Sequence, residues 1–315
     1  MDLRALLAGL TSAAVPQVPE VTGVCCDSQR IRPGDVFVAI PGFREDGRCH
    51  IAEAKARGAV CVLSREPVQE LPWAAVQDPR RALAEVSARL YRHPDRELAV
   101  VGVTGSVGKT TAKEMVAQAL TAKFRVLKTA GNQNSQVGVP ITVCGLKKDH
   151  TAAVVEMGVS MPGEMARIAA VVKPTCAVMT NIGVSHIEFM KTRENILKEK
   201  AHIADYIPVD GALFVNGDDD LLPTLKETLG GKVVTFGLGP TCDWRAYGLN
   251  EADKGTFFTC LSPTGEKTEV FVPAAGEHNV RNALAAMAVA RDLGVPAEDA
   301  VRAISAYKAP AMRQQ

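Results

Sequence analysis

The chain has 315 residues, of which 47% are hydrophobic and 23% charged, and its formal net charge is +1 at pH 7. This length suggests about two domains, and the composition is ordinary for a protein with well-filled hydrophobic cores. The nearly balanced charge argues against nucleic acid or a membrane surface as a partner, and the sequence has no apolar run of about 18 residues that would predict a membrane span.

The cysteines and the start of the chain indicate a reducing compartment. The 8 cysteines are scattered and form no CxxC pair, which favours buried free thiols over disulfides or zinc. The opening MDLRALLAGL is too short and too interrupted for a signal peptide. We therefore expect a cytoplasmic protein.

The first part of the chain, residues 1 to about 97, predicts a small α/β unit. Strands are expected at 21–27, 36–40 and 59–63, and helices at 51–57 and 79–91. The loop at 42–47 is rich in glycine and charge, which suits ligand binding, although a solvated turn is the default interpretation. The triplet His93-Pro94-Asp95 predicts a domain boundary.

The second part alternates strands and helices almost to the end of the chain. Strands are expected at 98–103, 124–129, 152–157, 176–181, 212–216 and 232–236, and helices at 113–120, 163–172, 193–206 and 277–292. This alternation predicts a doubly wound, mostly parallel sheet, which residues 240–275 would extend with antiparallel hairpins.

The stretch from Leu98 to Thr111, LAVVGVTGSVGKTT, predicts a strand, a glycine-rich turn and the start of a helix. In this geometry backbone N–H groups converge on a phosphate. Gly105 and Gly108 permit the tight turn. Lys109 adds a positive charge, and Thr110 offers a hydroxyl to Mg²⁺.

The spacing of this loop departs from the strict P-loop pattern. That pattern needs a glycine six residues before the lysine, which is Val103, whereas Gly102 stands one position too early. A turn between a strand and a surface helix is the alternative interpretation, and the complete strand–loop–helix context argues against it.

Polar residues follow several predicted strands, at the edge where parallel sheets bind ligands. They are Thr104, Gly105, Glu156, Thr180, Asn181, Asn216, Asp218 and Asp219. Each alone could be a turn residue or a helix cap, but four such strand ends beside a phosphate loop favour a nucleotide and metal site. Since Mg²⁺ prefers oxygen ligands, Thr110 and Glu156 are its first candidates.

Three further residues have both a functional and a structural interpretation. His186 ends the stretch NIGVSHIE just past a strand, where it is a candidate ligand for a second metal ion or a structural histidine. Lys198 and Lys200 lie on a predicted helix, and a solvated helix face is the simplest interpretation of both.

Taken together, these motifs resemble the Mur ligases, the ATP-dependent amide-bond-forming enzymes of peptidoglycan synthesis. The matching stretches occur in the family's order at 27–60, 102–115, 131–143, 156–165, 180–188, 216–220 and 276–286. The stretches GNQNSQVGVP and EMGVSMPGE favour the MurF type, which adds D-alanyl-D-alanine, over the MurE type, which adds the third stem-peptide residue.

The resemblance implies catalytic roles for Lys109, Glu156, His186 and Lys200. Thr110 and Glu156 would bind Mg²⁺ and His186 a second metal ion. Lys200 falls where family members carry a lysine carbamylated by CO₂, and Lys198 is a near neighbour that could be confused with it.

The resemblance also implies the binding residues. ATP would be held by Thr104, Gly105, Ser106, Val107, Gly108, Lys109, Thr110 and Thr111, with Asn279 and Asn282 near the adenine. The UDP part of the substrate would contact Asp27, Ser28, Gly42, Asp46 and Gly47. The cleft would be lined by Asn132, Asn134 and Glu164.

The implied reaction joins UDP-N-acetylmuramoyl-tripeptide to D-Ala-D-Ala. ATP would phosphorylate the tripeptide carboxylate, and the amine of D-Ala-D-Ala would then displace phosphate from the acyl phosphate. The resemblance implies a cytoplasmic monomer that uses ATP and Mg²⁺.

Two features depart from the family pattern. Val107 stands where many members have asparagine, which removes one side-chain contact. Mur ligases also have a C-terminal domain that is expected to begin near Tyr307, whereas this sequence ends at Gln315. We therefore expect two domains, 1–97 and 98–310, in a truncated form that is weakly active or inactive alone.

Three alternatives remain open. A MurE-type ligase would add a single amino acid. A folylpolyglutamate synthetase would lack the UDP-type N-terminal region. A non-catalytic nucleotide-binding protein on the same fold would have no need of Lys109, Thr110, Glu156, His186 and Lys200 together.

Overall fold

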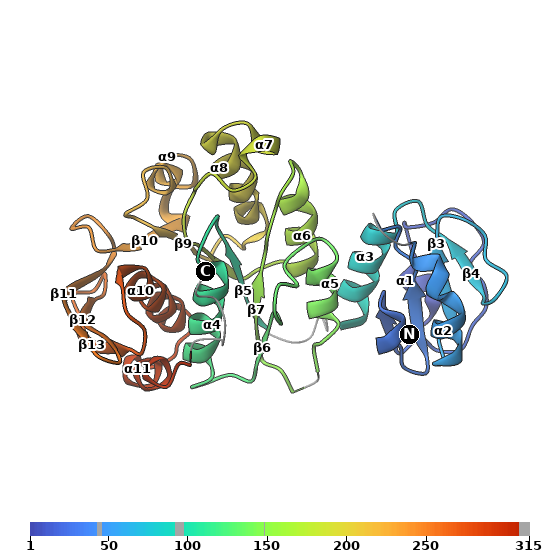
Figure 1. Cartoon of the computed structure of the whole chain (residues 1–315), viewed down its shortest axis with the longest axis horizontal. Helices are drawn as coiled ribbons and strands as arrows, with labels where there is room; N and C mark the ends of the chain where they lie inside the picture. The colour runs from blue at the N-terminus through green and yellow to red at the C-terminus, as the bar shows by residue number, and fades with distance from the viewer. Residues whose placement is uncertain (43–45, 92–97, 148, 309–315) are drawn as a thin grey trace. The chain divides into compact units, whose positions relative to one another are not determined.

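The computed structural model describes residues 1–42, 46–91, 98–147 and 149–308. The chain divides into two compact units, the first made of Met1–Arg96 with Ser135–Lys147 and the second of Glu97–Asn134 with Lys148–Gln315. Figure 1 shows both units. The expected domains, 1–97 and 98–310, thus differ from these units in the placement of 135–147. The expected boundary at His93-Pro94-Asp95 lies outside the described residues.

The first unit is built on a four-stranded sheet in the order β1-β2-β3-β4, with every neighbouring pair parallel. Its strands are β1 Gly23–Cys25, β2 Asp35–Val38, β3 Cys61–Ser64 and β4 Trp73–Ala75. Its helices are α1 Leu3–Leu6, α2 Ile51–Ala56, α3 Pro79–Tyr91 and α5 Gly138–Val143. Strands β2 and β3 are buried along their whole length, as expected for a parallel sheet covered on both faces.

The segment 135–147 packs in the first unit because its apolar side chains cover α3. Val137 and Cys144 lie against the hydrophobic cluster that includes Leu83 and Val86. The hydroxyl of Ser87 on α3 also lies 3.1 Å from the Cys144 thiol. From its position in the sequence, this segment was expected in the second domain. Its apolar contacts instead place it in the first unit.

The second unit contains a nine-stranded sheet in the order β13-β12-β11-β10-β9-β8-β5-β7-β6. Its parallel strands are β5 Ala99–Thr104, β6 Val126–Lys128, β7 Ala152–Glu156, β8 Cys176–Met179, β9 Leu213–Asn216 and β10 Val233–Gly237. The strands β11 Trp244–Ala252, β12 Gly255–Leu261 and β13 Lys267–Val272 extend it as an antiparallel meander, with β13 at one edge. The expected fold class, a small N-terminal α/β unit followed in the sequence by a mostly parallel α/β sheet, is confirmed.

The α-helices of the second unit lie between the strands of its sheet and after the last of them in the sequence. They are α4 Lys109–Leu120, α6 Glu164–Val172, α7 Ile187–Met190, α8 Arg193–Ala201, α9 Leu225–Leu229, α10 Glu277–Asp292 and α11 Ala297–Ser305. On β5, Val101 and Val103 join the cluster formed with α4 and α10. A Cβ placed at Gly102 would lie 2.8 Å from the Ile203 side chain on the other face, so a larger residue there would have to displace that side chain.

The expected helix at 193–206 was too long. The α-helix α8 ends at Ala201, and residues His202–Tyr206 form a tighter 3-10 turn. Conversely, α11 was not predicted, although its face carries Ala300 and Ile304 in the core. Among the residues that the structure describes, no helix is long and apolar enough to cross a membrane.

Two neighbouring phenylalanines on β12 allow a direct test of this core. Phe258 is 1% exposed and packs in the α4–α10 cluster, whereas Phe257 is 48% exposed on the opposite face. We expect Phe258→Ala to lower the free energy of unfolding by about 3–5 kcal/mol and Phe257→Ala by less than about 1.5 kcal/mol. Urea unfolding followed by circular dichroism measures both. Equal losses would contradict the assigned strand facing.

Candidate functional site

In the glycine loop between β5 and α4, two glycines adopt backbone conformations that favour glycine. Gly105 has φ +144°, and a Cβ there would lie 2.0 Å from the hydroxyl oxygen of Thr180, so this position requires glycine. Gly108 is the left-handed N-cap of α4, with φ +82°. The ammonium of Lys109 folds back over the loop and donates to the carbonyls of Gly105 and Ser106, each at 2.9 Å.

The segment after β8 holds the glycine loop in place. Thr180 donates its hydroxyl to the carbonyl of Val107 at 2.6 Å. The side-chain oxygen of Asn181 accepts the backbone N–H groups of Ser106 and Val107 at 3.1 and 2.8 Å. Gly183 donates its N–H to the Ser106 hydroxyl at 2.9 Å. Thr180 and Asn181 thus lie at the loop, as their positions after a strand suggested.

A buried carboxylate lies beside the start of α4. Glu156 ends β7, and it is 1% exposed. One of its oxygens accepts the hydroxyl of Thr110 at 2.9 Å, and the other accepts the side-chain amide of Asn134 at 2.8 Å. Both partners are neutral, and Glu156 forms no ion pair with a cation among the residues that the structure describes. A buried charge without a counter-charge is costly, so this carboxylate suits a bound cation.

Lys200 and Lys198, which the sequence could not tell apart, differ sharply in burial. Lys200 is 3% exposed and donates to the carbonyl of Gly105 at 3.1 Å, whereas Lys198 is exposed. Burial, together with the positive charge of Lys109, lowers the pKa of Lys200 to about 7, and Glu199 opposes this shift. The expectation of a solvated face therefore fails for Lys200, which lies at the glycine loop.

The start of α10 also lies close to the loop. A Cβ built on Gly108 would be 3.9 Å from the side-chain oxygen of Asn282. Asn279 and Asn282 are buried to 9% and 7% exposure, and Asn279 donates its amide to the carbonyl of Ala275 at 2.7 Å. The structure thus brings Asn282, a predicted ATP contact, to the phosphate loop.

His186 occupies an exposed, left-handed position. Its φ is +62°, and it is the N-cap of the short helix α7. Over the described residues, no group of three or more His, Cys, Asp and Glu side chains is arranged to hold a metal ion. Its predicted role as a ligand of a second metal ion stays a prediction.

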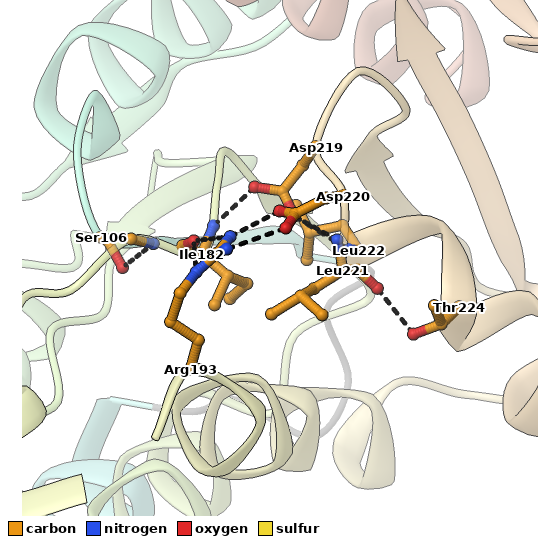
Figure 2. Close-up of polar contacts among 9 residues, drawn as sticks. Ser106, Ile182, Arg193, Asp219, Asp220, Leu221, Leu222 and Thr224 are labelled. Carbon is orange, nitrogen blue, oxygen red and sulfur yellow. Dashed lines mark hydrogen bonds and ion pairs between the residues drawn. The ribbon is translucent and has the colours of Figure 1, made fainter. Parts of the chain in front are cut away.

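Aspartates after β9 hold the neighbouring loop, as Figure 2 shows. Asp219 accepts the N–H groups of Ile182, Leu221 and Leu222, each at 2.9 Å. Asp220 pairs with the guanidinium of Arg193, which also donates to the carbonyl of Ile182. These contacts join the segment after β8 to α8 and to the turn after β9.

Asp218, in the same turn after β9, contacts a different set of partners. Its carboxylate accepts the N–H groups of Leu238 and Gly239 and pairs with Arg281 of α10 at 2.6 Å. Although burial opposes it, this set of donors holds the pKa of Asp218 below its usual value. Asp218 and Asp219 are therefore structural acceptors in this turn.

The predicted residues of the cleft have different surroundings. Asn134 contacts Glu156, whereas Asn132 is exposed. Glu164 accepts the N–H groups of Ser160 and Met161 at 2.6 and 3.2 Å and so holds the turn before α6. Thr104 donates its hydroxyl to the Met157 carbonyl at 2.8 Å.

Sequence reasoning missed Glu199, whose carboxylate caps α6. It accepts the N–H groups of Gly163 and Met165 at 2.7 and 2.8 Å and is 7% exposed. Helix N-termini favour such a charge because their first N–H groups have no partner within the helix. A glutamate between two lysines on a helix gives no sequence signal for this contact.

The predicted UDP contacts lie at the carboxyl ends of β1 and β2 in the first unit. Asp27 accepts the N–H of Gln29 at 3.0 Å, and Ser28 donates its hydroxyl to Glu53 at 2.6 Å. Asp46 pairs with the guanidinium of Arg48 at 2.8 Å and pairs through its backbone with Pro41.

Two glycines flank the same loop. A Cβ at Gly47 would lie 2.7 Å from the backbone of Ile40, so the loop closes tightly there. Gly42 is exposed, and residues 43–45 of the loop, including Arg44 and Glu45, lie outside the described residues.

Comparison with known proteins gives the class of the chain. The model of the Mur ligase middle domain matches residues 103–290, and the model of the Mur ligase catalytic domain matches residues 20–130. The first match covers more than half of the chain and includes the glycine loop, Glu156 and Lys200. The chain belongs to the Mur ligase family.

Individual relatives show which type of Mur ligase the chain is most similar to among those compared. The UDP-N-acetylmuramoyl-tripeptide--D-alanyl-D-alanine ligase of Bacillus subtilis is 34% identical over 297 residues, which are 93% of this chain and 63% of that protein. A crystal structure of MurF from Acinetobacter baumannii superposes with a TM-score of 0.88 at 32% identity, covering 98% of this chain and 68% of the other. The MurF ligase from Thermotoga maritima, solved in complex with ADP, gives 0.81 at 27% identity, over 92% and 66%.

The predicted resemblance to the MurF type of Mur ligase is thus confirmed. The chain spans 63% of the length of the curated Bacillus relative that it matches.

The lowered pKa of Lys200 predicts a pH-dependent stability. Between about pH 7 and 10.5 the unfolded chain holds a proton on this amine that the folded chain does not, so stability must rise with pH. We expect the wild type to gain up to about 1.4 kcal/mol per pH unit over Lys200→Met across this window. Urea unfolding at pH 7, 8 and 9 measures the difference. A wild-type advantage that stays constant or shrinks with pH would contradict the lowered pKa.

Proposed function

We propose that the chain carries the nucleotide-binding and UDP-substrate-binding parts of an ATP-dependent ligase. This ligase joins D-alanyl-D-alanine to UDP-N-acetylmuramoyl-tripeptide in peptidoglycan synthesis. The observation that carries the proposal is the carboxylate of Glu156, buried between the neutral side chains of Thr110 and Asn134 beside the glycine loop. The identity with the Bacillus ligase of that name supports the same reaction.

The oxygen donors at this position fit Mg²⁺. Thr110 and Glu156 would hold the ion, since Mg²⁺ binds through few protein oxygens and the phosphates of its substrate. Bound there, Mg²⁺ would offset the negative charge of the phosphates that a carboxylate must approach.

The reaction needs a leaving group, because a free carboxylate is a poor acylating agent. ATP would transfer its γ-phosphoryl group to the tripeptide carboxylate and leave as ADP. The amine of D-Ala-D-Ala would then attack the acyl phosphate, and phosphate would leave. The chain's residues would act by binding and orientation: the loop N–H groups and Lys109 on the phosphates, and Asn279 and Asn282 near the adenine.

Lys200 is proposed to become carbamylated: its neutral amine nitrogen forms a bond to the carbon of CO₂ and loses one proton to solvent. Only a neutral amine can attack CO₂, and the pKa of about 7 leaves a large share of Lys200 neutral at physiological pH. The product would place an anionic group at the glycine loop, where Lys109 supplies a positive charge. His186 is proposed as a ligand of a second metal ion.

The first unit is proposed to bind the UDP part of the substrate through Asp27, Ser28, Gly42, Asp46 and Gly47. Asn132, Asn134 and Glu164 are proposed to line the cleft. A UDP-linked substrate and eight free cysteines fit a cytoplasmic protein, which we propose acts as a monomer.

Replacing Lys109 tests the phosphate-binding role. The Lys109→Ala variant loses a charged hydrogen-bond donor to phosphate. We therefore expect its affinity for ATP to fall by about 10–100-fold and its affinity for UDP-N-acetylmuramoyl-tripeptide to stay unchanged. Isothermal titration calorimetry measures both affinities. Lys198→Ala is the matched control, since it removes the same charge from an exposed site. Equal ATP affinity in Lys109→Ala and wild type would refute the role.

A ligation assay tests the whole reaction. One reaction contains the chain with UDP-N-acetylmuramoyl-tripeptide, ATP, Mg²⁺ and D-Ala-D-Ala. A second reaction also contains the part of the Bacillus ligase that does not align with this chain. We expect a D-Ala-D-Ala adduct and ADP, weak or absent with the chain alone and stronger with the added part.

The alternatives are tested by repeating the assay with a UDP-linked dipeptide and single amino acids in place of the tripeptide and D-Ala-D-Ala. Ligation of a single amino acid to a UDP-linked dipeptide would identify a MurE-type enzyme instead. Nucleotide binding without turnover under any of these conditions would indicate a non-catalytic protein.

A further inference from the structure

Lys113 is a buried lysine that the proposed reaction does not use. It lies three residues after Thr110 on α4, so both side chains lie on one face of the helix. Its side chain is 1% exposed. Its ammonium donates to the carbonyl of Thr129 at 2.7 Å and pairs with Glu114 at 2.7 Å. A charged amine is costly to bury, and these contacts are what compensate it.

Thr129 connects this ammonium to the carboxylate at the candidate metal site. Thr129 follows β6 and is 0% exposed. While its carbonyl accepts Lys113, its hydroxyl oxygen accepts the backbone N–H of Glu156 at 2.9 Å. Its own N–H donates to the carbonyl of Val154 on β7 at 3.1 Å. Thr129 is therefore fixed by three contacts, two of which are to the strand that carries Glu156.

We propose that Lys113 is a positioning residue for Glu156, an inference that rests on the proposed function of this carboxylate. Helix α4 then holds Glu156 at two points. The Thr110 hydroxyl bonds the carboxylate directly, and Lys113 holds its backbone N–H through Thr129. The helix that begins at the phosphate loop thus also fixes where the carboxylate lies relative to that loop.

The ion pair with Glu114 does not account for Lys113. Glu114 also pairs with Lys128, whose side chain is 49% exposed, so its charge has a cation without Lys113. A methionine or leucine would fill the same space without the cost of burying a charge. What the ammonium alone provides is a donor to the Thr129 carbonyl.

The test compares Lys113→Met with wild type by two measurements. The first is amide hydrogen exchange at Glu156 in the nucleotide-free protein, which we expect to become at least tenfold faster. The second is ADP binding titrated with Mg²⁺. We expect the Mg²⁺ concentration at half effect to rise at least fivefold, whereas ADP affinity in EDTA stays within twofold. Loss of a merely structural contact would not separate these two affinities.

Three further variants control the result. Lys128→Met removes the other cation of Glu114 and should leave both measurements unchanged. Lys113→Arg retains a donor and should restore at least half of the Mg²⁺ effect. Should Lys113→Met not fold, Thr129→Val serves in its place: it keeps the carbonyl, removes the acceptor of the Glu156 N–H, and should give the same two changes.

The outcomes separate this inference from the proposed function. Unchanged exchange at Glu156, or an unchanged Mg²⁺ requirement where the wild type binds Mg²⁺-ADP, would overturn the positioning role. Faster exchange at Glu156 combined with no Mg²⁺-dependent nucleotide binding by the wild type would support the positioning role and refute the proposed metal site.

Discussion

The site depends on one electrostatic constraint, a carboxylate that is almost removed from water and that, within the described part of the chain, forms no ion pair with a side-chain cation. Glu156 keeps its place because neutral donors occupy both oxygens. Such a group is stable only if its surroundings are rigid, since a small displacement would cost a hydrogen bond in a medium of low polarity. Strand β7 is paired on both sides, with β5 and with β6, and this pairing supplies that rigidity.

The same requirement explains how the neighbouring loops are built. The glycine loop is held by side chains from the segment after β8, and that segment is held in turn by Asp219 and by Arg193. Each link joins a side chain to a backbone group, so few of these contacts depend on two long, flexible side chains meeting. The carboxyl edge of the sheet thus becomes a connected network, as parallel α/β folds require of their binding edge.

The local sequence pattern was sufficient to predict those strands and helices that the spacing of apolar residues determines. The strands β5, β7 and β8 and the helix Glu277–Asp292 could be placed from apolar runs and helical spacing. The burial of Lys113, Glu199 and Lys200 could not be predicted in this way, because a charged residue on a helix is expected to be solvated. Their roles come from partners 16 to 95 positions away along the chain. Asn134, by contrast, belonged to a motif that already pointed to the cleft.

The outermost strand of the large sheet has a consequence for the behaviour of the protein at high concentration. An open edge strand can pair with the edge of another molecule and start aggregation. On β13, Lys267 and Glu269 are exposed, and the hydroxyl of Ser305 occupies the carbonyl of Phe271. Charge and a capped acceptor therefore make the β13 edge a poor template for a further strand from another molecule.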